Sequence, residues 1–126
     1  MRLLLIGLGG AVGSVLRYLL SGIVQTGSGA TDFPTGTLAV NVLGCLVIGV
    51  LTELSESRGV LDAEMRALLV VGLVGGFTTF STFANETLSA MRDRALVIAV
   101  TNVLLSVILG LIAIWLGRML AHALWG

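Results

Sequence analysis

The sequence predicts an all-α integral membrane protein with four transmembrane helices, the third of them broken in mid-membrane. The composition is 56% hydrophobic and only 11% charged, and a soluble domain of 126 residues needs a larger polar surface than that. Four apolar stretches each reach the roughly 18 to 20 residues that cross a hydrocarbon core. The third stretch also carries glycines, hydroxyls and aromatic rings in its middle.

The predicted helices cover about 3–24, 37–54, 67–90 and 95–120, so that residues 1–126 form a single transmembrane domain. Backbone groups in lipid must bond within their own segment, which makes each stretch a helix. The first stretch continues past Arg17 into more apolar sequence, which is unlike a cleaved signal peptide. Its glycines follow a G-x-G-x-x-x-G spacing, which predicts close helix packing rather than a dinucleotide site.

The arginines are divided almost evenly between the two ends of such a bundle. One end would hold four and the other three: Arg2, Arg58, Arg66 and Arg118 against Arg92, Arg94 and Arg17. This division is too even for the positive-inside rule to set one orientation. The chain is therefore expected to insert both ways, which would permit an antiparallel, dual-topology dimer. A formal net charge of zero argues against a nucleic-acid partner.

The third helix carries the most unusual sequence, between Gly72 and Glu86. Gly75 and Gly76 weaken a helix, and the hydroxyls that follow compete for backbone hydrogen bonds. We expect a break here. Irregular backbone at membrane depth is tolerated only where it is buried in protein or lines a wet cavity.

Polar residues in the neighbouring helices extend this feature. Asn41 lies in the middle of the second helix, and Asn102 and Ser106 share one face of the fourth. Taken singly, each is explained better by ordinary interhelical hydrogen bonding. Together with the broken helix they indicate a continuous polar track, rich in donors and poor in ionised groups, which suits a small anion better than a cation. Phe80 and Phe83 would offer the positive edges of their rings.

These residues resemble the Fluc (CrcB-type) fluoride channels. The segment Gly75–Phe83 (GGFTTFSTF), followed by Glu86, is similar to that family's helix-three signature. The segments Gly36–Asn41 and Gly13–Tyr18 resemble its helix-two and helix-one motifs. The resemblance covers essentially the whole chain.

The resemblance implies a multi-pass protein of the bacterial plasma or inner membrane that exports fluoride passively, as an antiparallel dimer with two pores. The partner would be a second copy or a paralogous subunit. By the same resemblance, the residues that line or border the fluoride pore are Asn41, Thr79, Phe80, Ser81, Thr82, Phe83, Asn102 and Ser106, with Arg17 and Glu86 near its mouths.

The family also holds a structural sodium ion at the dimer centre through main-chain carbonyls, which would correspond to those of Gly75 and Thr78. A broken helix frees carbonyl oxygens, and hard oxygen donors suit a hard cation. Arg17 has a second interpretation, a snorkelling arginine near a helix end.

Two other functions stay open at this point. A small four-helix, proton-coupled multidrug exporter has the same size, but it needs an embedded carboxylate, and Glu53 and Glu86 lie near helix ends. An accessory subunit without transport would scatter its polar residues. No enzyme is expected, since no nucleophile and base are paired in the sequence.

Overall fold

The computed structural model describes all 126 residues, and every regular element in it is helical. The elements are α1 (Arg2–Ser28), α2 (Thr35–Arg58), α3 (Ala63–Arg66), the π-helix η1 (Ala67–Val74), α4 (Gly75–Phe77), α5 (Phe80–Arg92) and α6 (Leu96–Trp125). They form four runs long and apolar enough to cross a membrane. This confirms the predicted four-span fold, and the protein is a multi-pass membrane protein.

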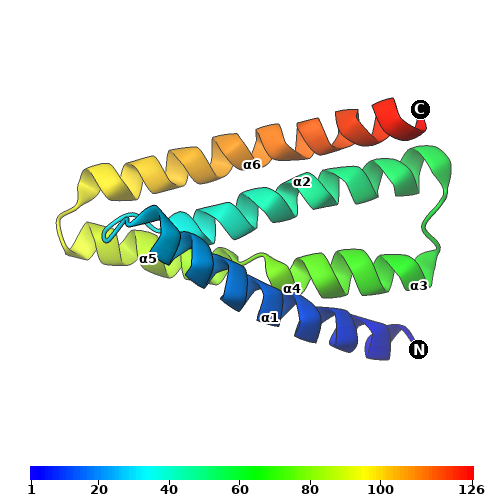
Figure 1. Ribbon diagram of the computed structural model, residues 1–126, viewed down its shortest axis with the longest axis horizontal. Coiled ribbons are helices and arrows are strands. Elements are labelled where there is room, and N and C mark those ends of the chain that lie inside the picture. Colours follow the sequence, from blue (N-terminus) through cyan, green and yellow to red (C-terminus); the bar gives the residue numbers. More distant parts are fainter.

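The four runs lie up and down along one long axis, with both chain termini at the same end (Figure 1). Each run is a few residues longer than the sequence predicted. We call the run from Ala63 to Arg92 the third span. Gly29 and Gly59 end α1 and α2 with φ angles of 68° and 60°, the left-handed conformation that glycine adopts without strain.

Glycines set the distance between α1 and the first half of the third span. A Cβ atom added to Gly72 would lie 2.9 Å from the carbonyl oxygen of Ile6, and one added to Gly76 would lie 2.6 Å from that of Gly10. A Cβ atom on Gly13 would meet the carbonyl oxygen of Leu73. The backbones therefore touch, which confirms the close packing predicted from the glycine spacing.

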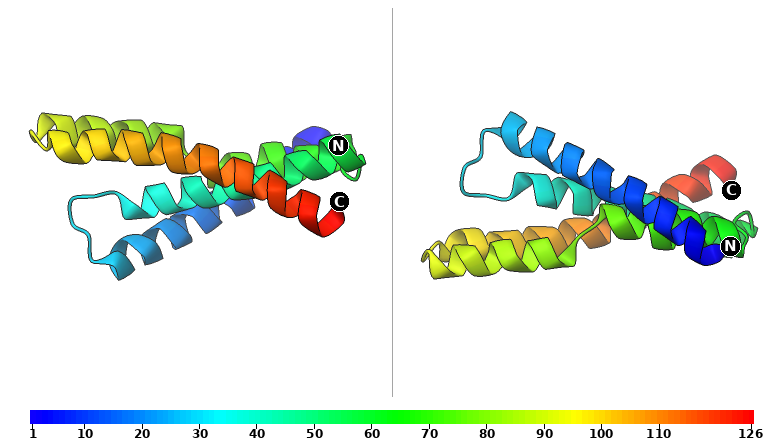
Figure 2. Two further views of the ribbon diagram at one scale, coloured as in Figure 1. Left: turned by 90° about the horizontal axis from the view of Figure 1, so that it is seen from above. Right: turned by 90° about the horizontal axis from the view of Figure 1, so that it is seen from below.

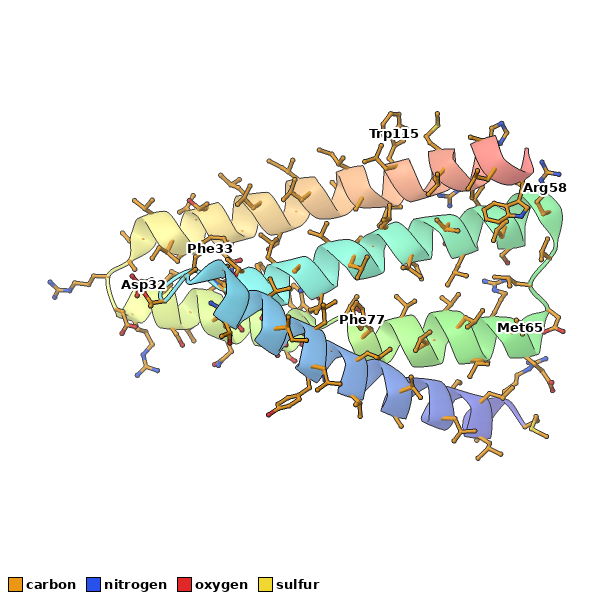
Figure 3. The ribbon with its side chains drawn as sticks, in the orientation of Figure 1. Asp32, Phe33, Arg58, Met65, Phe77 and Trp115 are labelled. Carbon is orange, nitrogen blue, oxygen red and sulfur yellow. The ribbon has the colours of Figure 1, made fainter.

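At the opposite end from the termini, the helices separate into two pairs, α1 with the start of α2 and α5 with α6 (Figure 2). Gln25 ties the first pair together. Its amide nitrogen donates to the carbonyls of Ala30 and Phe33, at 2.9 and 3.0 Å, and its amide oxygen accepts from the Gly36 N–H at 3.0 Å. In Figure 3, Asp32 and Phe33 mark this end of the molecule, while Arg58 and Met65 mark the other.

Candidate functional site: the break in the third span

The third span is interrupted at two residues, Thr78 and Thr79, which are extended with ψ angles of 157° and 113°. The break follows the glycine pair rather than coinciding with it. Gly75 and Gly76 remain helical, and Gly76 serves the close contact with α1. The Thr79 hydroxyl then restarts the helix, because it accepts from the Thr82 N–H at 3.2 Å as the N-cap of α5.

Asn41 satisfies the backbone that the break exposes. Its amide nitrogen donates to the Thr79 carbonyl at 3.0 Å, and its amide oxygen accepts from the Thr79 N–H at 2.8 Å. Unpaired backbone groups at this depth would be costly, so a side chain replaces the missing helical partners. The sequence analysis predicted a place in a polar track for Asn41, and the structure shows it bonded to the backbone of the break.

A hollow of about 410 Å³ lies beside the break, and we call it the central hollow. No charged residue lines it; its walls are Asn41, Gly44, Cys45, Ile48, Val70, Val74, Gly75, Thr78, Thr79, Phe80, Phe83, Ser106 and Val107. The rings of Phe80 and Phe83 are 5.6 Å apart and tilted by 51°. Phe80 is 79% exposed on the single chain, an unusual position for a ring flanked by hydroxyls.

A second hollow of about 230 Å³, the side hollow, lies between α1, α2 and the start of α5. Arg17 and Thr82 line it, and Thr79 lines both hollows. The Thr79 hydroxyl also lies 3.3 Å from that of Ser81 and 3.1 Å from that of Thr82. The turn from Thr79 to Thr82 therefore separates the uncharged central hollow from the side hollow, which is lined by one charged side chain, that of Arg17.

Glu86 lies farther along α5 and faces the second helix. One of its carboxylate oxygens accepts from the Thr37 hydroxyl at 2.7 Å, and the other, Oε2, is buried with no hydrogen-bond partner. Sequence reasoning missed Thr37, although it lies four residues before Asn41 and therefore on the same helical face.

Comparison with known proteins matches residues 4–118 to the family model described as "CrcB-like protein, Camphor Resistance (CrcB)". The chain belongs to this family. It is 47% identical over 116 residues to the fluoride-specific ion channel FluC of Methylobacillus flagellatus, covering 92% of this chain and 91% of that protein.

Two other relatives give the same picture. The chain is 46% identical over 123 residues to FluC of Citrifermentans bemidjiense, covering 98% of each protein. It is 49% identical over 115 residues to FluC of Phocaeicola vulgatus, covering 91% of this chain and 93% of the relative. All three relatives carry the name of a fluoride-specific ion channel, and the matches extend over nearly the full length of each protein.

In this CrcB-family chain, Ser106 and Asn102 occupy different environments despite sharing a face of α6. Ser106 lines the central hollow, whereas Asn102 is only 2% exposed and does not line it. The amide nitrogen of Asn102 donates to the Thr87 hydroxyl of α5 at 3.0 Å. The sequence analysis did not single out Thr87.

The break also leaves two backbone carbonyls beside the central hollow, those of Gly75 and Thr78, without the N–H donors that a continuous helix would give them. In a continuous helix the Thr79 N–H would bond to the Gly75 carbonyl, but here it donates to Asn41. Likewise the Thr82 N–H, the helical partner of the Thr78 carbonyl, donates to the Thr79 hydroxyl. These oxygens fit a hard cation such as sodium, which prefers oxygen ligands.

Proposed function

We propose that this chain is a fluoride-specific ion channel that lets fluoride leave the cell passively and so lowers its cytoplasmic concentration. The observation that carries the proposal is the interrupted third span beside the uncharged central hollow, in a chain of the CrcB family. Its relatives of nearly equal length are named as fluoride-specific channels. It is not an enzyme.

Fluoride is small and strongly hydrated, so a pore must replace its water with hydrogen-bond donors. The hydroxyls of Ser81 and Thr82 and the amide of Asn41 would supply these donors along the break, and Thr79, whose own proton is donated to the Thr82 hydroxyl, would line the pathway and hold that hydroxyl in place. The ring edges of Phe80 and Phe83 would add weaker, positively polarised contacts. Arg17 in the side hollow would concentrate anions at the entrance, because a cation in a low-dielectric wall attracts them strongly.

The polar residues farther from the break complete the proposed pathway. Ser106 would contact the ion where it lines the central hollow, and Asn102 would act from behind it. Glu86, whose Oε2 lacks a partner inside the single chain, would border one mouth.

The pore would be completed by a second chain. Phe80, Ser81 and Thr82 are exposed on the single chain at mid-span, where lipid offers no hydrogen-bond partner. A second copy would cover them. The even division of arginines between the ends supports an antiparallel, dual-topology arrangement, in which residues 1–126 form one channel domain per subunit.

The same dimer would hold a structural sodium ion. The carbonyls of Gly75 and Thr78 would be its ligands, and two chains would double their number. The ion would coordinate the carbonyl oxygens that the break leaves without hydrogen-bond donors, and so would hold the broken spans of the two chains together.

The decisive test is fluoride efflux from proteoliposomes, followed with a fluoride electrode beside chloride efflux from the same preparation. We expect fluoride release with little chloride release. Phe80→Ile or Phe83→Ile should lower fluoride flux about tenfold or more, which corresponds to about 1.4 kcal/mol in the barrier. Phe77→Ile is the matched control, because that ring lies in the same span but does not line the central hollow.

Three outcomes would count against specific parts of the proposal. Purified protein that releases no fluoride would overturn the channel function. Unchanged flux in both Phe80→Ile and Phe83→Ile would overturn the role of the rings. A monomer by light scattering, when this chain is expressed on its own, would overturn the homodimer and favour pairing with a paralogous subunit.

A further inference from the structure

Three hydrogen bonds form a directed chain that runs away from the central hollow. The Ser106 hydroxyl donates to the amide oxygen of Asn102 at 3.4 Å. The amide nitrogen of Asn102 donates to the Thr87 hydroxyl at 3.0 Å, and that hydroxyl donates to the Phe83 carbonyl at 2.8 Å. Every proton in the chain therefore points from α6 toward the backbone of α5.

Asn102 is the centre of this chain and has no access to the hollow. It is 2% exposed and does not line the central hollow, whereas Ser106 and Phe83 do. Both ends of its amide are engaged by protein partners. Any influence of Asn102 on an ion in the hollow must therefore pass through Ser106 or Thr87.

The direction of the chain decides what Ser106 presents to the hollow. A serine hydroxyl has one proton, and here that proton is given to Asn102, so lone pairs face the ion pathway. An anion needs the proton instead. The Ser106–Asn102 contact, at 3.4 Å, is the longest of the three bonds and exceeds the usual range of about 2.5 to 3.0 Å for bonds between a hydroxyl and an oxygen, so it is the one that yields most easily.

We propose that Asn102 is a positioning residue that lowers the affinity of the pathway for fluoride, because it competes with the passing ion for the Ser106 proton. This inference rests on the proposed function. Fluoride concentrates its charge and accepts hydrogen bonds strongly, so it draws the hydroxyl away from Asn102. Chloride is a weaker acceptor and leaves the proton where it is. Fluoride must break the Ser106–Asn102 bond before it can use the proton, so Asn102 weakens fluoride binding beside Ser106 and eases release of the ion.

The test is the Asn102→Leu variant, which fills the same space without an acceptor and frees the Ser106 proton. In proteoliposomes, the fluoride concentration for half-maximal flux should fall about two- to threefold, the lower end of what one hydrogen bond is worth. Chloride gains less than fluoride from the freed proton, so chloride flux relative to fluoride flux should not rise. In a Ser106→Ala background, Asn102→Leu should change neither quantity, because the contested proton is gone.

Thr87→Val is the matched control. It removes the other partner of Asn102 but leaves the amide oxygen available to Ser106. A purely structural role for Asn102 predicts that Asn102→Leu and Thr87→Val alter flux alike, and this result would overturn the inference. Asn102→Val removes the same acceptor with a smaller side chain and serves if the leucine variant does not fold.

The two levels of the argument fail differently. If the unmodified protein releases no fluoride, the proposed function and this inference fall together. If it releases fluoride while Asn102→Leu leaves the fluoride concentration for half-maximal flux unchanged, or raises chloride flux relative to fluoride flux, only the inference is overturned.

Discussion

The two halves of the third span come from one continuous apolar stretch but differ in how they pack and in which side chains they expose. The half before the break, from Ala63 to Phe77, is held against α1 by contacts between glycine backbones. The half after it, from Phe80 to Arg92, packs mainly on α6 and has no buried residue within the single chain. The first half is an anchor, whereas the second presents rings, hydroxyls and a carboxylate.

This difference shows how a membrane helix can contain irregular backbone and still keep its packing against the neighbouring helices. The anchor is fixed by shape, because no side chain separates the two backbones. The site half is fixed at its start by hydrogen bonds from Asn41 and Thr79. Disrupting the glycine contacts of the anchor should therefore lower the free energy of unfolding most. Removing the hydrogen bonds at the break, which we call the junction, should lower it less, and removing a peripheral helix cap should lower it least.

The largest effect is expected from Gly13→Leu, which drives a side chain into the backbone at Leu73. We expect a loss of about 3 kcal/mol or more in the free energy of unfolding, at the upper end for overpacking. Reversible denaturation in detergent measures it. Gly7→Leu is the control, since a Cβ atom there meets nothing within 4 Å, and its effect should stay within about 0.5 kcal/mol. Equal effects of the two variants would contradict the anchor.

Asn41→Ala should have the next largest effect, because it leaves both backbone groups of Thr79 without their partner. We expect about 2 kcal/mol or more of destabilisation, together with reduced fluoride flux. Leu43→Ala in the same helix is the control, since that side chain is 41% exposed and does not line the central hollow. A stable Asn41→Ala variant with normal flux would show that the break holds itself open without the asparagine.

Thr79→Val keeps the shape of the side chain but removes the N-cap of α5. The Thr82 N–H loses its acceptor, the Thr82 hydroxyl loses the donor that it had in the Thr79 hydroxyl, and the Ser81 hydroxyl loses its hydrogen-bond partner. Because Thr79 is buried, we expect about 1 to 2 kcal/mol, the upper part of the range for caps. Hydrogen exchange should show lost protection at the Thr82 amide. An unchanged exchange rate there would refute the capping role.

The smallest effect is expected from Asp62→Ala, which removes the cap at the start of the anchor half. The Asp62 carboxylate accepts from the Met65 N–H at 2.8 Å, but it is exposed, and water replaces it readily. We expect about 0.5 to 1 kcal/mol by the same denaturation assay and no change in fluoride flux. If Asp62→Ala lowers the free energy of unfolding more than Thr79→Val does, the ranking of the junction above the peripheral cap is wrong.

The sequence analysis anticipated much of this because its signals are local. Hydropathy over 18 or more residues predicted the four spans, and the glycine spacing predicted the contact between α1 and the third span. The hydroxyl-rich run predicted a break. Its position at Thr78 and Thr79 was not predictable, since the glycines that weaken the helix are helical in the structure and the capping hydroxyl determines where α5 begins.

The sequence by itself determined that this chain is a membrane protein with four spans, of which the third is broken. It could do so because segment length, hydropathy and helix-breaking residues each act within one segment. Only the tertiary structure decided what each polar side chain does. Asn41 bonds to Thr79, 38 residues away, and Asn102 bonds to Thr87 and does not line the hollow that Ser106 lines. Such pairings depend on how helices rotate and approach one another, and no local pattern along the chain encodes that geometry.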